Sequence, residues 1–257
     1  MMPVNPHWFN LFLYIWLGLA GVIFILLVVL KIEVPYGRYT RTGWGSFIRN
    51  RAGWVLMEFP SLVVFSALFL AEGRKHDAVT WFFFAIWVFH YINRSLIYPF
   101  RIRPFSKKMP LSVMFMGIFF NLINASANGY YLGFLKPDYP DAWWKDIRFI
   151  LGVMIYLFGV VANWWADGKL IRLRKNHDNE YKIPYGGLFR YVSCPNYLGE
   201  IMEWSGFALM AWNLPALAFA VWTFANLVPR ALNHQAWYQR TFPAYPKERK
   251  ALIPFIL

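Results

Sequence analysis

The residues best suited to chemistry lie in the stretch 184–204, where a polar loop leads directly into an apolar helix that contains two carboxylates. If that helix begins near Asn196, then Asn196, Glu200 and Glu203 are spaced i, i+4 and i+7 and share one face. An ionised carboxylate in a membrane helix costs roughly 3 kcal/mol on insertion scales, so such residues are usually kept for a function. The pattern predicts a polar pocket that opens towards the loop.

A second pair of polar groups lies in the N-terminal half. Glu58 is a lone carboxylate within an apolar run, and Pro60 just after it loosens the local helix. Glu58 either reaches the membrane surface or a neighbouring helix, or it is a protonatable group in a buried site. Tyr91, Arg94 and Tyr98 are spaced i, i+3 and i+7, and we interpret Tyr98 as an interfacial side chain. Tyr91 lies deeper and needs a hydrogen-bond partner, for which Glu58 is a candidate.

Three further helical faces are polar. Asn121, Asn124 and Asn128 are spaced i, i+3 and i+7, and they either join helices or line a cavity. The other two faces carry Asn163 and Asp167, followed by a basic run that includes Arg174, and Arg230, His234 and Tyr238. The basic run suits either lipid headgroups or phosphates. The sequence has no glycine-rich phosphate loop, serine nucleophile elbow or histidine metal motif, so we expect no metal.

The composition indicates an integral membrane protein. Hydrophobic residues make up 58% of the 257 residues and charged residues 15%, whereas soluble domains have about 25% charged residues. Many of the 14 tryptophans lie near the ends of apolar runs, as in interfacial belts. The single cysteine, Cys194, excludes an intrachain disulfide. The first apolar run is too long for a cleaved signal, and we interpret it as a retained span.

Seven apolar runs predict seven transmembrane helices in a single domain, 1–257. The runs are approximately 9–30, 52–71, 78–99, 111–133, 147–166, 197–213 and 214–229. Four intervening segments contain 21 of the 26 Lys and Arg residues, and all four fall on one side of a seven-span model: 31–51, 94–110, 167–195 and 230–250. The positive-inside rule makes that side cytoplasmic, so the N-terminus is predicted outside and the C-terminus inside. The net charge of +13 therefore indicates an anionic membrane face and an anionic ligand rather than nucleic acid.

Several strings together resemble the steroid 5α-reductase family over nearly the whole chain. They are Tyr139-Pro140-Asp141, Asp146-Ile147-Arg148-Phe149, Ile183-Pro184 with Gly186-Gly187-Leu188-Phe189, Asn196-Tyr197-Leu198-Gly199-Glu200, Leu214-Pro215-Ala216-Leu217-Ala218-Phe219-Ala220 and Arg249-Lys250-Ala251-Leu252-Ile253-Pro254-Phe255. The resemblance implies a seven-helix membrane reductase that uses NADPH to reduce the Δ4 double bond of a 3-oxo steroid. It also implies that 1–110 mainly faces the substrate and that 111–257 mainly binds NADPH.

The resemblance further assigns roles to individual residues. Glu58 and Tyr91 match the catalytic residues that bind the steroid carbonyl. The positions that match cofactor contacts are Tyr36, Arg103, Asn163, Asp167, Arg174, Asn196, Glu200, Arg230, His234 and Tyr238. The family has Gln before its catalytic Glu, whereas this chain has Met57, which hydrogen-bonds a carbonyl poorly. Asn233 is a second departure, because mammalian members have His there.

Two other interpretations stay open from the sequence. One is a membrane methyltransferase of the isoprenylcysteine type, which binds S-adenosylmethionine and resembles this chain in its last two spans. The other is a non-catalytic bundle that binds sterols. For the reductase we expect a monomeric, multi-pass bacterial homologue in the inner membrane, or a protein of the endoplasmic reticulum if the source is eukaryotic. Its partners would be a steroid or sterol-like lipid and membrane lipids.

Overall fold

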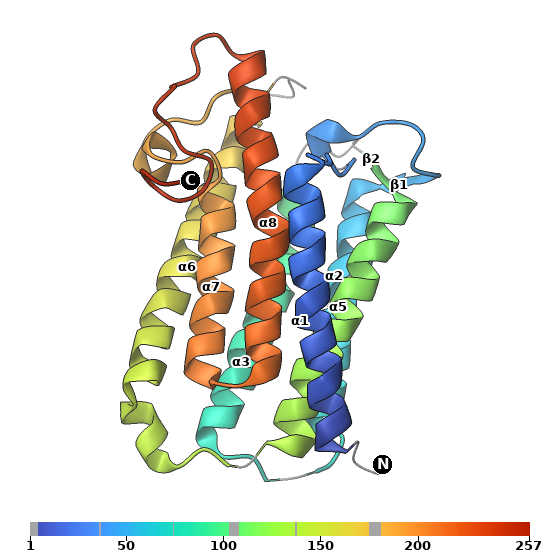
Figure 1. The fold of residues 1–257 in the computed structure, drawn as a ribbon, viewed down its shortest axis with the longest axis vertical. Coiled ribbons are helices and arrows are strands. Elements are labelled where there is room, and N and C mark those ends of the chain that lie inside the picture. Colours follow the sequence, from blue (N-terminus) through green and yellow to red (C-terminus); the bar gives the residue numbers. More distant parts are fainter. Residues whose placement is uncertain (1–4, 36, 74, 103–107, 137, 175–180) are drawn as a thin grey trace. The chain divides into compact units, whose positions relative to one another are not determined.

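The computed structural model describes residues 5–35, 37–73, 75–102, 108–136, 138–174 and 181–257 (Figure 1). The chain forms two compact units. Unit 1 comprises Met1–Phe9 and Val34–Lys145, and unit 2 comprises Asn10–Glu33 and Asp146–Leu257. Each unit is described by itself below.

The regular structure is almost entirely helical. The helices are α1 Pro6–Val29, α2 Asn50–Leu70, α3 Ala78–Ile92, α4 Tyr98–Arg101, α5 Leu111–Tyr130, α6 Ile147–Leu173, α7 Pro195–Ala211 and α8 Leu214–Thr241. Two short strands, β1 Phe47–Arg49 and β2 Lys108–Pro110, pair with each other. Two π-helical segments, Asn93–Ile97 and Tyr131–Leu135, extend α3 and α5 respectively.

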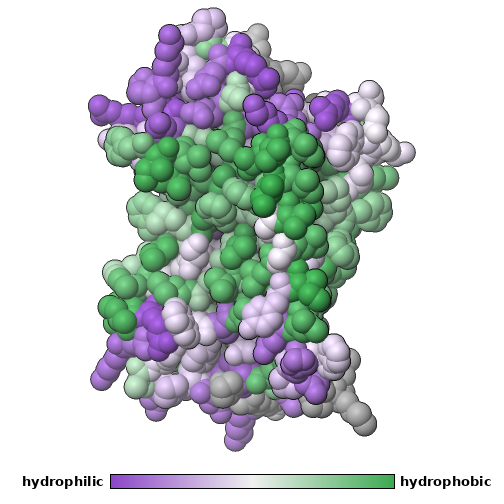
Figure 2. All heavy atoms as spheres, in the orientation of Figure 1, coloured by the Kyte–Doolittle hydropathy of each residue, from purple (hydrophilic) through white to green (hydrophobic). Residues whose placement is uncertain are grey.

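Within the described ranges, five helices are long and apolar enough to cross a membrane: α1, α2, α5 with its π-helical extension, α6 and α8. On the face shown in Figure 2, hydrophobic side chains cover the middle of the helices and hydrophilic ones gather towards their ends. These features confirm the predicted all-α membrane architecture. Helix α7 has 17 residues, less than the roughly 20 that a full span needs, and α3 with its π-helical extension is not among the five, so the seven crossings stay a prediction.

Two helices extend well beyond the apolar runs that predicted them. The run 147–166 lies in α6, which ends at Leu173, and the run 214–229 lies in α8, which ends at Thr241. In both cases the extra turns contain basic and polar residues. Hydropathy reports the length of the lipid-facing segment, whereas helical hydrogen bonding continues past it wherever side chains pack against the rest of the unit.

In unit 1, the two strands join the beginnings of α2 and α5. Phe47 is opposite Pro110 and Arg49 is opposite Lys108 in an antiparallel pair. Because β1 leads directly into α2 and β2 directly into α5, both helices start at the same end of the unit and run in the same direction. This pairing also brings the basic segments 31–51 and 94–110 to one end of unit 1, as the sequence predicted.

Helices α2 and α3 pack antiparallel through aromatic side chains. The Phe65 ring is stacked on Trp87, with centroids 4.4 Å apart, and Phe69 lies 4.6 Å from Phe84. The Trp87 indole Nε1–H donates to the backbone oxygen of Ser61 at 3.4 Å. These contacts fix the register of the two helices. One turn further along α2, from Phe65 to Phe69, the partner on α3 moves one turn back, from Trp87 to Phe84.

Glycines on α5 permit close contact with α2. A Cβ added to Gly129 would lie 2.9 Å from the backbone oxygen of Phe65, and one added to Gly117 would overlap the side chain of Met57. Asn121, one turn after Gly117, donates to α2 as described below. Since there is little hydrophobic driving force between helices in lipid, such backbone-level packing is a main source of helix association.

A buried ion pair organises the end of unit 1 opposite the strands. Asp77 caps the start of α3 by accepting from the backbone N–H of Thr80 at 2.8 Å, and it also accepts from Lys136 Nζ at 2.9 Å. Lys136 is 2% exposed, and its ammonium lies over the Tyr139 ring. Burial alone raises the pKa of Asp77, but the hydrogen bonds from Thr80 and Lys136 outweigh it and lower the pKa to about 2.

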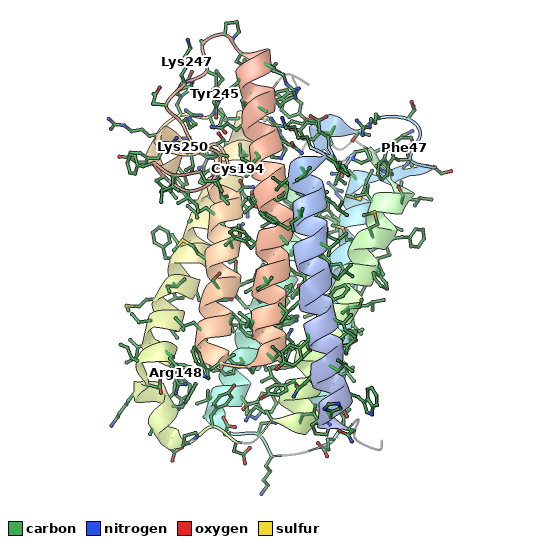
Figure 3. The ribbon with its side chains drawn as sticks, viewed as in Figure 1. Phe47, Arg148, Cys194, Tyr245, Lys247 and Lys250 are labelled. Atoms are coloured by element: carbon green, nitrogen blue, oxygen red, sulfur yellow. The ribbon has the colours of Figure 1, made fainter. Side chains whose placement is uncertain are left out.

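In unit 2, α1 packs on α8 and α7 is joined to α8 by a tight turn. The Trp222 indole donates to the backbone oxygen of Trp16 at 3.0 Å, and the two rings are 4.4 Å apart. Asn213 caps α8 by accepting from the backbone N–H of Ala216. The chain after α8 folds back onto the start of α7, where Figure 3 shows Cys194, Tyr245 and Lys250 close together at the end of the unit opposite Arg148.

We predict that Asp77→Asn destabilises unit 1 by about 1–3 kcal/mol at neutral pH, because Lys136 then loses its charged partner. The depressed pKa means that the carboxylate contributes stability above about pH 4, and that this contribution is lost as the pH falls towards about 2. Thermal unfolding of the detergent-solubilised protein should therefore show a difference between variant and parent that shrinks over this range. Glu72→Gln, at an exposed position, is the control. An equal difference at every pH would contradict the assignment.

Candidate active site

The cofactor positions of unit 2 are built on a close contact between α6 and α7. Gly152 and Gly159 on α6 face Gly206 and Gly199 on α7. A Cβ added to Gly199 would lie 2.5 Å from Asn163 N and 2.7 Å from Gly159 O, so the two backbones are in direct contact. The contact recurs seven residues along each helix, and the pairs run in opposite directions, so α6 and α7 are antiparallel.

This contact brings three predicted cofactor residues into one hydrogen-bonded group. Asn163 Nδ2 donates to the backbone oxygen of Asn196 at 2.9 Å, and Asn196 Nδ2 donates to Asp167 Oδ1 at 3.1 Å. Asn163 and Asp167 are buried, whereas Asn196 is partly exposed. The group anchors the first turn of α7 to α6.

The remaining α7 and α8 positions lie on the same unit. The Tyr197 hydroxyl and His234 Nε2 are 3.1 Å apart, which ties the start of α7 to α8. Arg230, His234 and Tyr238 follow one another at single-turn spacing along α8, and Tyr238 is 3% exposed. These hydrogen bonds join the three helices that carry the predicted residues, α6 to α7 and α7 to α8.

Arg174 lies at the C-terminal end of α6. Its guanidinium is 5.1 Å from the ring of Tyr181, whose ring in turn packs against Trp237 of α8. A phosphate-binding role for Arg174 is compatible with this position at the helix end. The two other predicted contacts, Tyr36 and Arg103, lie outside the described residues.

A cluster from the C-terminal chain supports this face and was not predicted from the sequence. The Tyr245 hydroxyl is 2.6 Å from Ser193 Oγ, and the Tyr245 ring is stacked on Tyr238 at 5.2 Å. Burial raises the pKa of Tyr245 above its usual value, and the Ser193 hydrogen bond and the nearby Arg249 cation offset only part of this increase. Tyr245 thus connects the loop before α7 to a predicted cofactor residue of α8.

Arg249 closes the cluster as a buried cation. It is 2% exposed, and its guanidinium carbon lies 4.8 Å from the Tyr245 ring and 5.6 Å from the Tyr185 ring. Its Nε and Nη1 groups have no hydrogen-bond partner among the described residues. Aromatic faces therefore provide much of the stabilisation of this charge. In the sequence, Arg249 was noted only as part of the string 249–255 that resembles the family. That resemblance does not show which side chains Arg249 contacts.

Glu203 differs from the expectation that it shares an open pocket with Asn196 and Glu200. It is 1% exposed and lies in the α6–α7 contact, where a Cβ on Gly159 would overlap its backbone N. Its side chain forms a hydrogen bond with Tyr156 of α6. Helical spacing alone could not show this, because the face of α7 that carries Glu203 is covered by α6.

In unit 1, Glu58 and Tyr91 lie at the same level of two packed helices. Glu58 is three residues before Ser61 on α2, and Tyr91 is four residues after Trp87 on α3. Trp87 hydrogen-bonds to Ser61, and the two helices are antiparallel. One turn towards the start of α2 and one turn towards the end of α3 therefore reach the same level, where Glu58 and Tyr91 lie. The next turn again shows contact, with Arg94 4.8 Å from the Trp54 ring. Both Glu58 and Tyr91 are buried, at 9% and 2% exposed.

Asn121 is a partner of Glu58 that the sequence did not identify. Its Nδ2 donates to Glu58 Oε2 at 3.1 Å and to the backbone oxygen of Met57 at 2.7 Å. The spacing of Asn121, Asn124 and Asn128 indicated a polar face on α5. The sequence did not show that α5 packs on α2 in the register that joins Asn121 to Glu58.

Comparison with known proteins decides the family. The family model described as 3-oxo-5-alpha-steroid 4-dehydrogenase matches residues 107–257. Steroid 5-alpha-reductase DET2 of Solanum lycopersicum is 40% identical over 260 residues, covering 100% of both chains. This chain belongs to the steroid 5-alpha-reductase family. Other members include DET2 of Gossypium hirsutum, 41% identical over 88% of this chain and 89% of its own, and human 3-oxo-5-alpha-steroid 4-dehydrogenase 1, 42% identical over 86% and 85%.

Family membership confirms the resemblance found in the sequence and favours an oxidoreductase over the methyltransferase and sterol-binding interpretations. Together with the five membrane-capable helices, it identifies a multi-pass membrane protein. The roles of the individual residues in this steroid 5-alpha-reductase homologue stay predictions.

We predict that Gly199→Ala disrupts the α6–α7 contact, because its methyl group meets backbone atoms of Asn163 and Gly159, which cannot rotate away. Overpacking of this kind costs on the order of 1–3 kcal/mol, and here it also displaces Asn196. Gly18→Ala on α1 is a matched control, because nothing lies within 4 Å of its added Cβ. Thermal unfolding in detergent should show a lower midpoint for Gly199→Ala and an unchanged one for the control. Equal midpoints would exclude the contact as a stabilising feature.

Proposed function

We propose that this protein reduces the Δ4 double bond of 3-oxo-Δ4-steroids to give 5α-steroids, with NADPH as cofactor. Bound NADPH supplies a hydride to steroid C5, and C4 gains a proton. Tyr91 and Glu58 hydrogen-bond the C3 oxygen. The main structural support is the register that places Glu58 and Tyr91 at one level of unit 1, in a chain whose relatives are named steroid 5-alpha-reductases.

The chemistry explains why two buried donors are needed. As C5 gains a hydride, the enone system becomes an enolate and negative charge develops on the C3 oxygen. Donors aimed at that oxygen stabilise the transition state most strongly where water is excluded. The Tyr91 hydroxyl and a protonated Glu58 carboxyl can both donate, and ketosteroid isomerase provides a precedent for a neutral carboxylic acid in this role.

The residues of unit 2 fit the chemistry of a phosphorylated dinucleotide. Asn163, Asn196 and Asp167 form a hydrogen-bonded group whose amides and carboxylate can bind ribose and amide groups. We assign the phosphates to Arg174 and Arg230, since guanidinium groups bind phosphate through paired N–H groups. Glu200, His234 and Tyr238 complete the described part of the proposed set, and Tyr36 and Arg103 are its members outside the described residues.

We also propose seven transmembrane spans, with the N-terminus outside and the C-terminus cytoplasmic, in a monomeric protein. The strand pair supports this topology in unit 1, because it joins basic segments at one end. In unit 2, the pairing of Val192 with Lys250 does the same for segments 167–195 and 230–250. The short helix α7 would then cross the membrane while partly sheltered by its neighbours.

The function can be tested with the purified protein in detergent or liposomes. We expect NADPH oxidation that depends on a 3-oxo-Δ4-steroid and yields the 5α-reduced product, identified by chromatography against both C5 epimers. NADH should support much slower turnover, because it lacks the phosphate that the basic residues bind. Steroid binding without NADPH oxidation would favour a non-catalytic bundle, and methyl transfer from S-adenosylmethionine would favour the methyltransferase.

The carbonyl-binding roles predict distinct effects on turnover. Tyr91→Phe removes one donor while keeping the ring, and it should lower kcat by on the order of 10²-fold or more. Glu58→Gln keeps a donor and should retain more activity than Glu58→Ala. NADPH binding should persist in all three variants, because the residues assigned to NADPH that the structure describes lie on other helices. Full turnover by Tyr91→Phe, or loss of its NADPH binding, would show that the residue is wrongly assigned.

A further inference from the structure

Asn121 connects α5 to the proposed catalytic carboxyl group. It is 5% exposed, and its Nδ2 donates to Glu58 Oε2 at 3.1 Å and to the backbone oxygen of Met57 at 2.7 Å. The Met57 carbonyl can only accept a hydrogen bond, so the NH₂ side of the amide must face α2. Both amide hydrogens therefore have acceptors on α2, and the amide orientation is fixed.

The other asparagines of this face bond differently. Asn124 Nδ2 donates to the backbone oxygen of Phe120, and Asn128 Nδ2 donates to that of Asn124, each four residues earlier on α5. Such bonds stay within one helix. The Asn121 amide crosses to α2, where it donates to Met57 and Glu58.

The local backbone explains how Asn121 reaches its acceptors. Gly117, one turn earlier on α5, has no side chain, and Met57 occupies the space that its Cβ would fill. On α2, Pro60 has no N–H and cannot donate to the carbonyl of Leu56, so hydrogen bonding in this turn is weakened. The adjacent Met57 carbonyl takes its additional hydrogen bond from Asn121.

The bond to Oε2 has a consequence for the carboxyl group. A neutral carboxylic acid has one accepting oxygen and one that bears the proton. Because Oε2 accepts from Asn121, and the carbonyl oxygen of an acid is its better acceptor, this bond favours the proton on Oε1 and holds the plane of the group from α5. The side chain of Met57, next to Glu58, has no N–H or O–H group that could do this. An amide on a neighbouring helix thus supplies the donor that the preceding residue lacks.

We propose that Asn121 is a positioning residue for the reaction: its amide orients the Glu58 carboxyl group so that Oε1–H points to the steroid C3 oxygen. This inference rests on the proposed function, in which Glu58 donates to that oxygen. Asn121 acts through Glu58 and has no role in NADPH binding.

The test is a double-mutant cycle on the full-length protein with a 3-oxo-Δ4-steroid. Asn121→Leu, which has a similar shape but no donor, should lower kcat roughly tenfold and leave the KM for NADPH unchanged. In the Glu58→Ala background the same substitution should change the residual kcat less than about twofold, because the residue through which Asn121 acts is gone. Asn128→Leu is the matched control, at a buried asparagine of the same helix, and should keep parental kcat.

The outcomes separate this inference from the proposed function. Full activity of Glu58→Ala would refute the role of Glu58 itself. If Glu58→Ala is impaired but Asn121→Leu is not, the inference alone fails. It also fails if the Asn121 effect is the same in both backgrounds, since that indicates a general loss of packing. Thermal unfolding and NADPH binding report whether each variant is folded, and Asn121→Ala replaces the leucine variant if the larger side chain prevents folding.

Discussion

The organisation of unit 2 depends on direct backbone contact between α6 and α7. Four glycines, two on each helix, remove the side chains that would otherwise separate the two axes. In lipid, apolar side chains gain little by leaving the acyl chains, so the closeness of the backbones and the polar bonds that it permits stabilise the pair. The Asn163–Asn196–Asp167 group exists because these helices approach so closely. A larger side chain at one of these glycines would therefore separate the residues of the proposed cofactor site even though it does not itself contact a ligand.

Much of the fold follows from the sequence, and the exceptions have a common cause. The apolar runs located the membrane helices, because a span needs a continuous lipid-facing surface. They did not predict that α6 and α8 continue to Leu173 and Thr241, since those turns pack on protein rather than on lipid. The run 78–99 is one continuous helical stretch, but its geometry changes from α to π at Asn93, which hydropathy cannot report.

The candidate site was predictable within each helix and unpredictable between helices. Spacings of three, four and seven residues predicted polar faces on α5, α6, α7 and α8, although on α7 the face with Glu203 is covered by α6. Which face meets which helix depends on register, and register is set by contacts such as Trp87 with Ser61 and Gly117 with Met57. Asn121 and Glu203 illustrate this limit. Each was recognised as a polar residue of a membrane helix, but its partner on the facing helix follows from packing that one sequence does not reveal.

The π-helical segment Asn93–Ile97 has a consequence for how this helix can change in evolution. A π-helical turn contains one residue more than the α-helical turn it replaces, so it is equivalent to a single inserted residue within a helix. Before it, the Trp87 indole is hydrogen-bonded to Ser61 of α2. Arg94 within it and Tyr98 directly after it both contact Trp54 of α2. Deleting one residue between positions 92 and 98 would convert the turn to regular α-helix and leave both anchored ends on their partners. A deletion anywhere else in α3 would rotate Tyr91 away from α2.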